Sequence, residues 1–234
     1  MTKVVPELAK CGVCGKGNEV YYLSSTHHCG ACDLDTRPLD TERFTIFLQR
    51  CVHCGYINTE ISDGDDDLQD FVGSQMYKTC EELNPVSEEA KQYIQYALLQ
   101  AYKQVATIWN GKEESYAQDN IFWGYMNAAW ACDDRAERKK DDQSRLDAIK
   151  CRNKCLAIIN SLIVNKKDQK EKEKLIGIKA DLLRRTGQFD ALVVEYENKV
   201  FESPYMNALI HFQIDRAKER DDKRYSTDNL ELKK

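Results

Sequence analysis

The hydrophobic positions change their period part-way along the chain. Between residues 43 and 50, Phe44, Ile46 and Leu48 alternate with Thr45, Phe47 and Gln49. Such alternation is typical of a strand, and residues 19–23 form a second short β-prone run. We therefore expect short strands in the first 62 residues.

From about residue 72 onward, the apolar positions recur every third or fourth residue, as on one face of a helix. The first stripe follows a helix-start signal at Asn84, Pro85 and Ser87. Its members are Ile94, Ala97, Leu98, Ala101, Val105 and Ile108. Two further stripes occupy residues 122–130 and 146–163, and the charged stretch 135–142 between them predicts the exposed end of a helical hairpin.

Residues 173–206 resemble one tetratricopeptide repeat of thirty-four residues. The matching positions are Ala180 and Leu183 in the first helix, Gly187 to Phe189 at the turn, Tyr196 in the second helix and Pro204 at the close. The departure is Leu192, where the repeat usually has alanine. Since one repeat cannot bury its own face, we expect neighbouring helices to stack on it.

These patterns predict an α+β chain that is mostly α. A small N-terminal domain of short strands, residues 1–62, is followed by an acidic linker, residues 63–71. A tetratricopeptide-like antiparallel helical domain occupies residues 72–222, and residues 223–234 form a polar, frayed tail. The linker composition also suggests a calcium loop, but it lacks the ligand spacing and the bidentate glutamate of such loops.

Composition narrows the class of protein. Of the 234 residues, 42% are apolar and 31% are charged, and the net charge is −5. No apolar run is long enough for a membrane span, and the first residues show no signal peptide. With ten cysteines and no export signal, the chain is expected to be cytoplasmic and to bind metal rather than form disulfides.

The cysteines supply the candidate chemistry. Three Cys-x-x-Cys pairs occur, at Cys11/Cys14, Cys29/Cys32 and Cys51/Cys54. Linear spacing favours joining the second and third pairs. However, Gly15 and Gly55 follow the outer pairs, and glycine permits the tight turn that aims backbone N–H groups at the sulfurs. We therefore assign a structural Zn²⁺ to Cys11, Cys14, Cys51 and Cys54.

The middle pair has three interpretations. Cys29 and Cys32 could ligate a second zinc together with His27 or His28, act as a redox dithiol, or lie in a loop near the first site. The four remaining cysteines, Cys80, Cys132, Cys151 and Cys155, are expected in the helical core.

An enzyme is the less favoured class. Four thiolates fill the coordination sphere of zinc and leave no position for an activated water. The chain has none of the metalloprotease, nucleophile-elbow, phosphate-loop, dinucleotide or deaminase motifs. We expect no catalytic and no cofactor-binding residues, and interpret His211 as a helix-surface residue.

The chain resembles a bacterial family of unknown function, domain of unknown function 2225. The resemblance covers residues 11–62, through Cys-x-x-Cys-Gly at 11–15, Asp-Leu-Asp-Thr-Arg-Pro at 33–38 and Cys-x-x-Cys-Gly-Tyr at 51–56. It supports the outer pairing, and it implies a helical remainder but no activity. Cys29 and Cys32 are extra to the family pattern.

The segment 33–38 invites two interpretations. In the first, Arg37 forms an ion pair with Asp33 or Asp35. This pair would hold the long segment between the two zinc knuckles, residues 15–50, against the ribbon. In the second, Arg37 binds a carboxylate group of a ligand or partner. We favour the structural interpretation, because nearby opposite charges usually satisfy each other first.

Together these features predict a non-enzymatic interaction protein, with a zinc-stabilised ribbon and a helical domain that holds a protein or peptide partner. Trp109, Trp123 and Trp130 are candidate anchors, although the spacing of the last two favours the helix core. The alternative is a nucleic-acid-binding ribbon, with Lys16, Arg37, Arg43 and Arg50 as cations and Tyr21, Tyr22 or Tyr56 as stacking groups. A redox or metal-dependent enzyme using Cys29/Cys32 is the second alternative.

Overall fold

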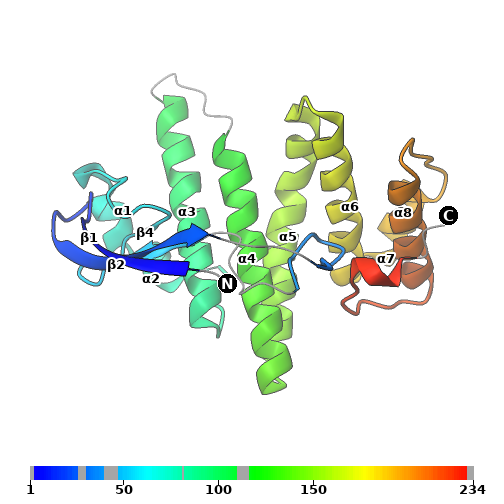
Figure 1. Cartoon of the computed structure of the whole chain (residues 1–234), viewed down its shortest axis with the longest axis horizontal. Helices are drawn as coiled ribbons and strands as arrows, with labels where there is room; N and C mark the ends of the chain where they lie inside the picture. Colours follow the sequence, from blue (N-terminus) through cyan, green and yellow to red (C-terminus); the bar gives the residue numbers. More distant parts are fainter. Residues whose placement is uncertain (1–2, 26–29, 40–46, 81, 110–115, 231–234) are drawn as a thin grey trace. The chain divides into compact units, whose positions relative to one another are not determined.

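The computed structural model of the chain describes residues 3–25, 30–39, 47–80, 82–109 and 116–230, and it is predominantly helical (Figure 1). This confirms the predicted α+β, mostly α class. Within these ranges, no helix is long and apolar enough to cross a membrane.

The strands are β1 (Lys3–Lys10), β2 (Gly17–Ser25), β3 (Gln49–Arg50) and β4 (Ile57–Asn58). The helices are η1 (Asp66–Leu68), α1 (Gln69–Gly73), α2 (Gln75–Thr79), α3 (Glu88–Trp109), α4 (Tyr116–Lys139), α5 (Asp142–Asn165), α6 (Gln169–Arg185), α7 (Phe189–Tyr196), α8 (Pro204–Lys218) and η2 (Thr227–Asn229).

The chain divides into two compact units. The N-terminal unit comprises residues 1–27 and 44–151, and the C-terminal unit comprises residues 28–43 and 152–234. Helix α5 contributes to both. The boundaries therefore differ from the sequence-based division at residues 62–72.

Two short antiparallel hairpins open the N-terminal unit. Strand β1 pairs with β2, from Lys10 opposite Gly17 outward, and β3 pairs with β4. The strand expected at residues 19–23 lies within β2. Of the strand expected at residues 43–50, residues 43–46 lie outside the described residues, and β3 covers only the last two positions.

The acidic stretch expected to be a linker is instead packed into the N-terminal unit. It contains η1 and the start of α1, and Leu68 and Phe71 are buried. The ring of Phe71 also stacks on Tyr102 of α3, with a centroid distance of 4.2 Å. These two apolar side chains, which the surrounding aspartates obscure in the sequence, fix the segment against the helices.

Helices α3 and α4 form the main helical pair of this unit (Figure 1). They approach closely at Gly124, where an added Cβ would lie 2.9 Å from the Cβ of Ala97. Trp130 is buried and Trp123 is half-buried, so Trp130 belongs to the core. The side chain of Trp109 lies outside the described residues.

In the C-terminal unit, α6 and α7 form a helix–turn–helix around Gly187, whose φ is +74°. Ala180, Leu183, Leu192 and Tyr196 all join one buried cluster with α8. These are the positions that the repeat pattern assigns to its core. Assignment to the tetratricopeptide class remains a prediction.

The segment expected to be a frayed tail is in large part ordered. Asp33 and Ser226 form an isolated antiparallel bridge, and the backbone N–H of Leu34 donates to the carbonyl of Tyr225 at 3.1 Å. The ring of Tyr225 meets Phe212 edge-on. Because the segment is otherwise polar, its sequence does not indicate that Tyr225 packs against a helix.

Candidate metal centre

The structure brings the four cysteines of the outer knuckles together. All four sulfurs lie within 4.8 Å of one another. The closest pairs join opposite knuckles: Cys11 Sγ lies 3.8 Å from Cys54 Sγ, and Cys14 Sγ lies 3.6 Å from Cys51 Sγ. These separations are far longer than a disulfide bond of about 2.05 Å.

Each knuckle is the turn of a hairpin. The first joins β1 to β2 and the second joins β3 to β4. Gly15 and Gly55, at φ +69° and +82°, each donate a backbone N–H to the carbonyl of the first cysteine of their knuckle, at 2.8 and 3.0 Å. A left-handed backbone at these two positions favours glycine, as expected from the sequence.

Asn18 ties the two knuckles to each other. Its side-chain amide donates to the carbonyl of Lys16 at 2.9 Å, and its oxygen accepts the backbone N–H of Val52 at 3.0 Å. Asn18 is only 4% exposed, so both bonds are shielded from water. This role could not be predicted from the sequence, because one asparagine after a glycine is common in turns.

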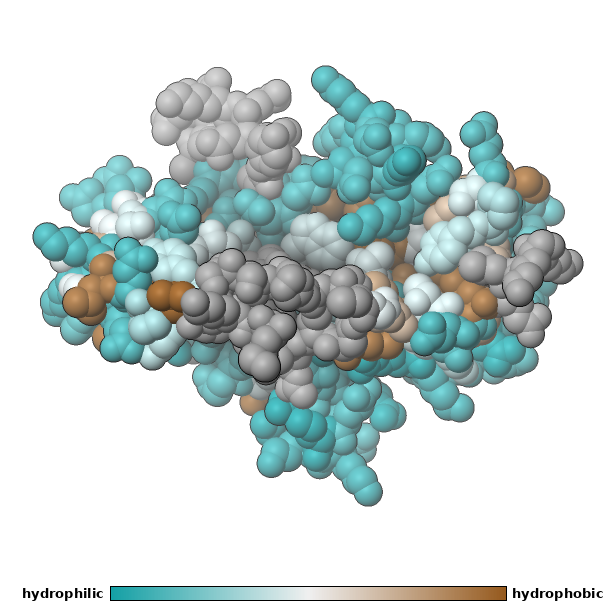
Figure 2. Space-filling model, in the orientation of Figure 1, coloured by the Kyte–Doolittle hydropathy of each residue, from teal (hydrophilic) through white to brown (hydrophobic). Residues whose placement is uncertain are grey.

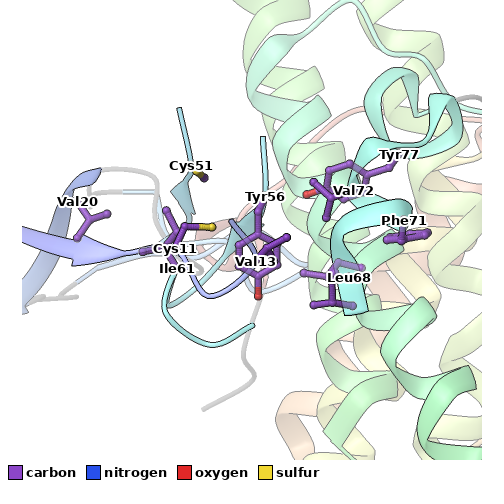
Figure 3. Packing of buried hydrophobic residues seen from close by; sticks show 11 residues of the cluster. Cys11, Val13, Val20, Cys51, Tyr56, Ile61, Leu68, Phe71, Val72 and Tyr77 are labelled. Atoms are coloured by element: carbon purple, nitrogen blue, oxygen red, sulfur yellow. The ribbon is translucent and has the colours of Figure 1, made fainter. Parts of the chain in front are cut away.

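The knuckles are continuous with a hydrophobic cluster that we call the ribbon core. It consists of Cys11, Val13, Val20, Cys51, Tyr56, Ile61, Leu68, Phe71, Val72, Tyr77 and Leu99. In Figure 3, Val13 and Tyr56 lie between Cys11 and the side chains of Leu68 and Val72. The Tyr77 hydroxyl accepts the backbone N–H of Ile57 at 3.1 Å, which links β4 to α2.

The donor set fits a tetrahedral thiophilic metal. Four thiolates about 2.3 Å from zinc would be separated by about 3.8 Å, close to the two measured distances. Burial raises the pKa of Cys51, but the backbone N–H groups of Cys54 and His53 and the neighbouring thiols outweigh it and lower the pKa to about 6. Burial raises the pKa of Cys11. A metal is the group that would hold all four as thiolates.

Cys32, the described member of the middle cysteine pair, is not part of this group of four cysteines. Cys32 belongs to the C-terminal unit, where its backbone N–H donates to Thr227 Oγ1 at 3.3 Å. Cys29, His27 and His28 lie outside the described residues. Among the described residues, the four outer cysteines are the only group of three or more candidate metal donors.

The segment 33–38 also lies in the C-terminal unit, which corrects the expectation that it locks against the ribbon. The carboxylate of Asp33 pairs with Arg224, with Oδ2 and Nε 2.7 Å apart. The backbone N–H of Arg37 donates to Asp35 Oδ1 at 3.2 Å, and Arg37 is buried. Arg224 was not singled out in the sequence because it lies in the segment expected to be frayed.

The remaining candidates have structural positions. Cys80, Cys132, Cys151 and Cys155 are all buried, as core packing predicts. Tyr56 is fully buried, so it offers no face for stacking on a base. Arg50 and Tyr21 are exposed, whereas Arg43 lies outside the described residues.

Comparison of the chain with protein-family models, with curated proteins and with solved structures gives no match.

Proposed function

We propose that the chain is a non-enzymatic zinc-binding interaction protein, in which Zn²⁺ stabilises the ribbon and the folded units contact a protein or peptide partner. The observation that carries the zinc assignment is the cluster of four sulfurs at tetrahedral spacing. Four protein donors complete the coordination of zinc, which is the arrangement of structural sites. The resemblance to the bacterial family rests on the motifs of residues 11–62.

Elemental analysis tests the metal assignment. We expect one zinc per chain both in the unmodified protein and in a Cys29→Ser/Cys32→Ser variant, because the four outer cysteines by themselves supply the four donors that a structural zinc requires. Cys11→Ser is expected to lose the zinc. Two zinc ions that fall to one in the double variant would establish a second site instead.

An exposed apolar face on the first hairpin supports the interaction role. Pro6 lies opposite Tyr21 and Leu8 lies opposite Glu19, so these residues share one face of β1 and β2. Leu8 is 83% exposed and Tyr21 is 45% exposed. The space-filling view shows apolar surface at this end of the N-terminal unit (Figure 2). Contiguous exposed apolar groups are typical of contact surfaces.

Affinity capture with matched variants tests the interaction. Leu8→Asp/Tyr21→Ser is expected to lose a partner that the unmodified protein retains, since a charge on this face prevents its burial. Val200→Asp is the control, because Val200 is 90% exposed and lies in the C-terminal unit. Capture of the same proteins by all three would contradict a role for the hairpin face.

Nucleic acid is the second candidate partner, favoured by a groove beside the second knuckle. The groove has a volume of about 490 Å³, and Arg50, His53 and Lys78 line it. Such side chains contact phosphates, so binding should weaken steeply with salt. A mixed-sequence single-stranded oligonucleotide should bind at low salt and lose affinity in Arg50→Gln/Lys78→Gln. No binding at low salt would eliminate this candidate.

A further inference from the structure

The groove beside the second zinc knuckle has a charge composition that indicates one class of partner. It lies entirely in the N-terminal unit, between residues 50–55 and the helices α1, α2 and α3. In Figure 3, Cys51 of the knuckle lies on one side, and Val72 of α1 and Tyr77 of α2 lie on the other. Its volume of about 490 Å³ is large enough for one side chain and its neighbours in a peptide.

Positive side chains line this groove and acidic ones do not. Arg50 and Lys78 are both exposed, and neither forms an ion pair with any residue that the structure describes. The ring of His53 is oriented at the same wall, because its Nε2 donates to the carbonyl of Gly17 at 3.2 Å. No aspartate or glutamate occurs among the described lining residues. Two positive charges therefore face the groove with no carboxylate beside them.

A long polyanion is a poor match for these two cations. The N-terminal unit contains 14 basic and 21 acidic residues, a net charge of −7. The attraction of Arg50 and Lys78 is screened within about 8–10 Å, so the phosphates further along a nucleic-acid strand would meet a unit of net negative charge. Tyr77 lines the groove but is only 1% exposed, so it offers no face to a base. The groove therefore favours a single, local anion of high charge.

We propose that this groove binds a phosphorylated side chain of a protein partner, which deepens the interaction function proposed above and rests on it. A phosphate monoester carries a charge of about −1.5 to −2 at pH 7 and three acceptor oxygens. It matches Arg50 and Lys78 in charge, whereas a carboxylate supplies only one negative charge. The planar guanidinium of Arg50 can donate two parallel hydrogen bonds to phosphate oxygens, and the ammonium of Lys78 adds a point charge.

The groove also offers an apolar contact for the residues on either side of the phosphate. Val52 lines it and is 79% exposed. A peptide whose phosphate binds Arg50 can cover Val52 with a neighbouring apolar side chain and gain free energy from the burial. Inorganic phosphate lacks this contact, so the lining favours a phosphorylated peptide over phosphate alone.

Backbone amide resonances report this binding directly. In zinc-loaded, ¹⁵N-labelled protein, acetyl-Leu-phosphoserine-Leu-amide should shift the amide signals of residues 50–55 and 78 saturably. The unphosphorylated peptide should cause no saturable shift up to about 10 mM. The same peptide with glutamate in place of phosphoserine, and inorganic phosphate, should each bind at least about fivefold more weakly than the phosphopeptide.

Matched variants separate the two groove cations from the general charge of the unit. Arg50→Gln/Lys78→Gln should weaken phosphopeptide binding at least about tenfold, because the charge-assisted hydrogen bonds are lost. Arg145→Gln/Lys139→Gln is the control, since it removes the same charge from exposed positions of the same unit outside the lining. It should leave the affinity within about twofold. Unchanged amide signals away from the groove show that each variant still folds.

No saturable shift with the phosphopeptide, equal binding of the glutamate peptide or of inorganic phosphate, or equal affinity in the two double variants would overturn the proposal. A mixed-sequence oligonucleotide that binds more tightly than the phosphopeptide and displaces it would assign the groove to nucleic acid instead. If the phosphopeptide fails to bind while affinity capture still retains a partner, the groove assignment alone is wrong. If both experiments fail, the interaction function is contradicted as well.

Discussion

At the scale of single residues, Gly12 sets how closely the first knuckle approaches the loop that follows β4. An added Cβ would lie 2.4 Å from the backbone oxygen of Gly64 and 2.7 Å from that of Ser62. Backbone atoms cannot relieve this overlap by a change of rotamer, as a flexible side chain can. Gly12→Ala is therefore expected to destabilise the N-terminal unit by about 1–3 kcal/mol, measured by urea unfolding of the zinc-loaded protein.

Gly17 supplies the matched control for this change. It begins β2, and an added Cβ there would meet no atom within 4 Å. Gly17→Ala should change the free energy of unfolding by less than about 0.5 kcal/mol. Equal effects of the two substitutions would show that the close approach at Gly12 carries no stability.

Asp33 gives the C-terminal unit a pH dependence. Burial, together with the charge of Asp35, raises the pKa of Asp33 to about 7, although Arg224, Arg185 and Arg37 oppose the shift. The unfolded carboxyl titrates near about 3.9. Between these values the folded state holds a proton that the unfolded state lacks, so the contribution of Asp33 to stability falls as pH rises, by up to about 1.4 kcal/mol per pH unit.

Asp33→Asn removes this titration. Thermal unfolding between pH 5 and 8 should show a flatter pH dependence for the variant, whereas a change of the exposed Asp228 to Asn should leave the slope as it is. Parallel curves for the unmodified protein and Asp33→Asn would contradict a raised pKa of Asp33 in the folded state.

Residue-level prediction from sequence worked where one local rule decides the geometry. Gly15 and Gly55 stand at positive φ behind their cysteines, and the sequence alone points to that conformation. Asn18, Tyr77 and Arg224 could not be found in the same way, because each acts on a backbone or side chain remote in the sequence. Nothing in their immediate neighbours marks them.

At the scale of elements, Arg184 joins α6 to α8 and to the segment that follows it. Its guanidinium bonds Asp181 Oδ1 at 2.8 Å and the carbonyls of Asp221 and Lys223 at 3.0 and 2.6 Å, and its Nε bonds Gln213 Oε1. Arg184 is fully buried and Asp181 is 2% exposed. The network therefore holds residues 221–223 against the helices.

Arg184→Met should destabilise the C-terminal unit by about 3–5 kcal/mol, because it leaves a buried carboxylate without its cation. It should also increase trypsin cleavage at Lys223 and Arg224. Arg220→Met is the control: its pair with Asp190 is exposed, so the expected loss is below about 1 kcal/mol. Unchanged cleavage and stability in Arg184→Met would refute this role.

The helical elements were the most predictable part of the fold, because their apolar stripes repeat over many turns. Ile94 and Ala97 of α3 and Phe122, Met126 and Trp130 of α4 are buried as the periodicity indicates. The structure does not match the linker expected at residues 63–71. Two apolar residues among five aspartates give too weak a hydrophobic periodicity to indicate a packed helix. The packing of Tyr225 was missed for the same reason, because the residues around it are polar.

At the scale of the whole molecule, the metal centre and the first helices share one core. The ribbon core includes Cys11 and Cys51 as well as Leu68 and Phe71 of η1 and α1, Tyr77 of α2 and Leu99 of α3. The sequence separates these parts at an acidic linker, but the buried contacts do not. Loss of the metal should therefore propagate beyond the two knuckles into the helices that complete their core.

Cys11→Ser tests this spread. Hydrogen exchange followed by mass spectrometry should show lost protection in β1 to β4 and in peptides covering residues 66–79, because the side chains that pack on the knuckles lose their partners. Helices α6 to α8 should keep their protection, since their cluster draws on residues of the C-terminal unit alone. Zinc removal with a chelator should reproduce the same pattern in the unmodified protein. Exchange confined to residues 11–16 and 51–56 would show that the ribbon core is stable without its metal, and equal loss in α6 to α8 would show that the two units unfold as one.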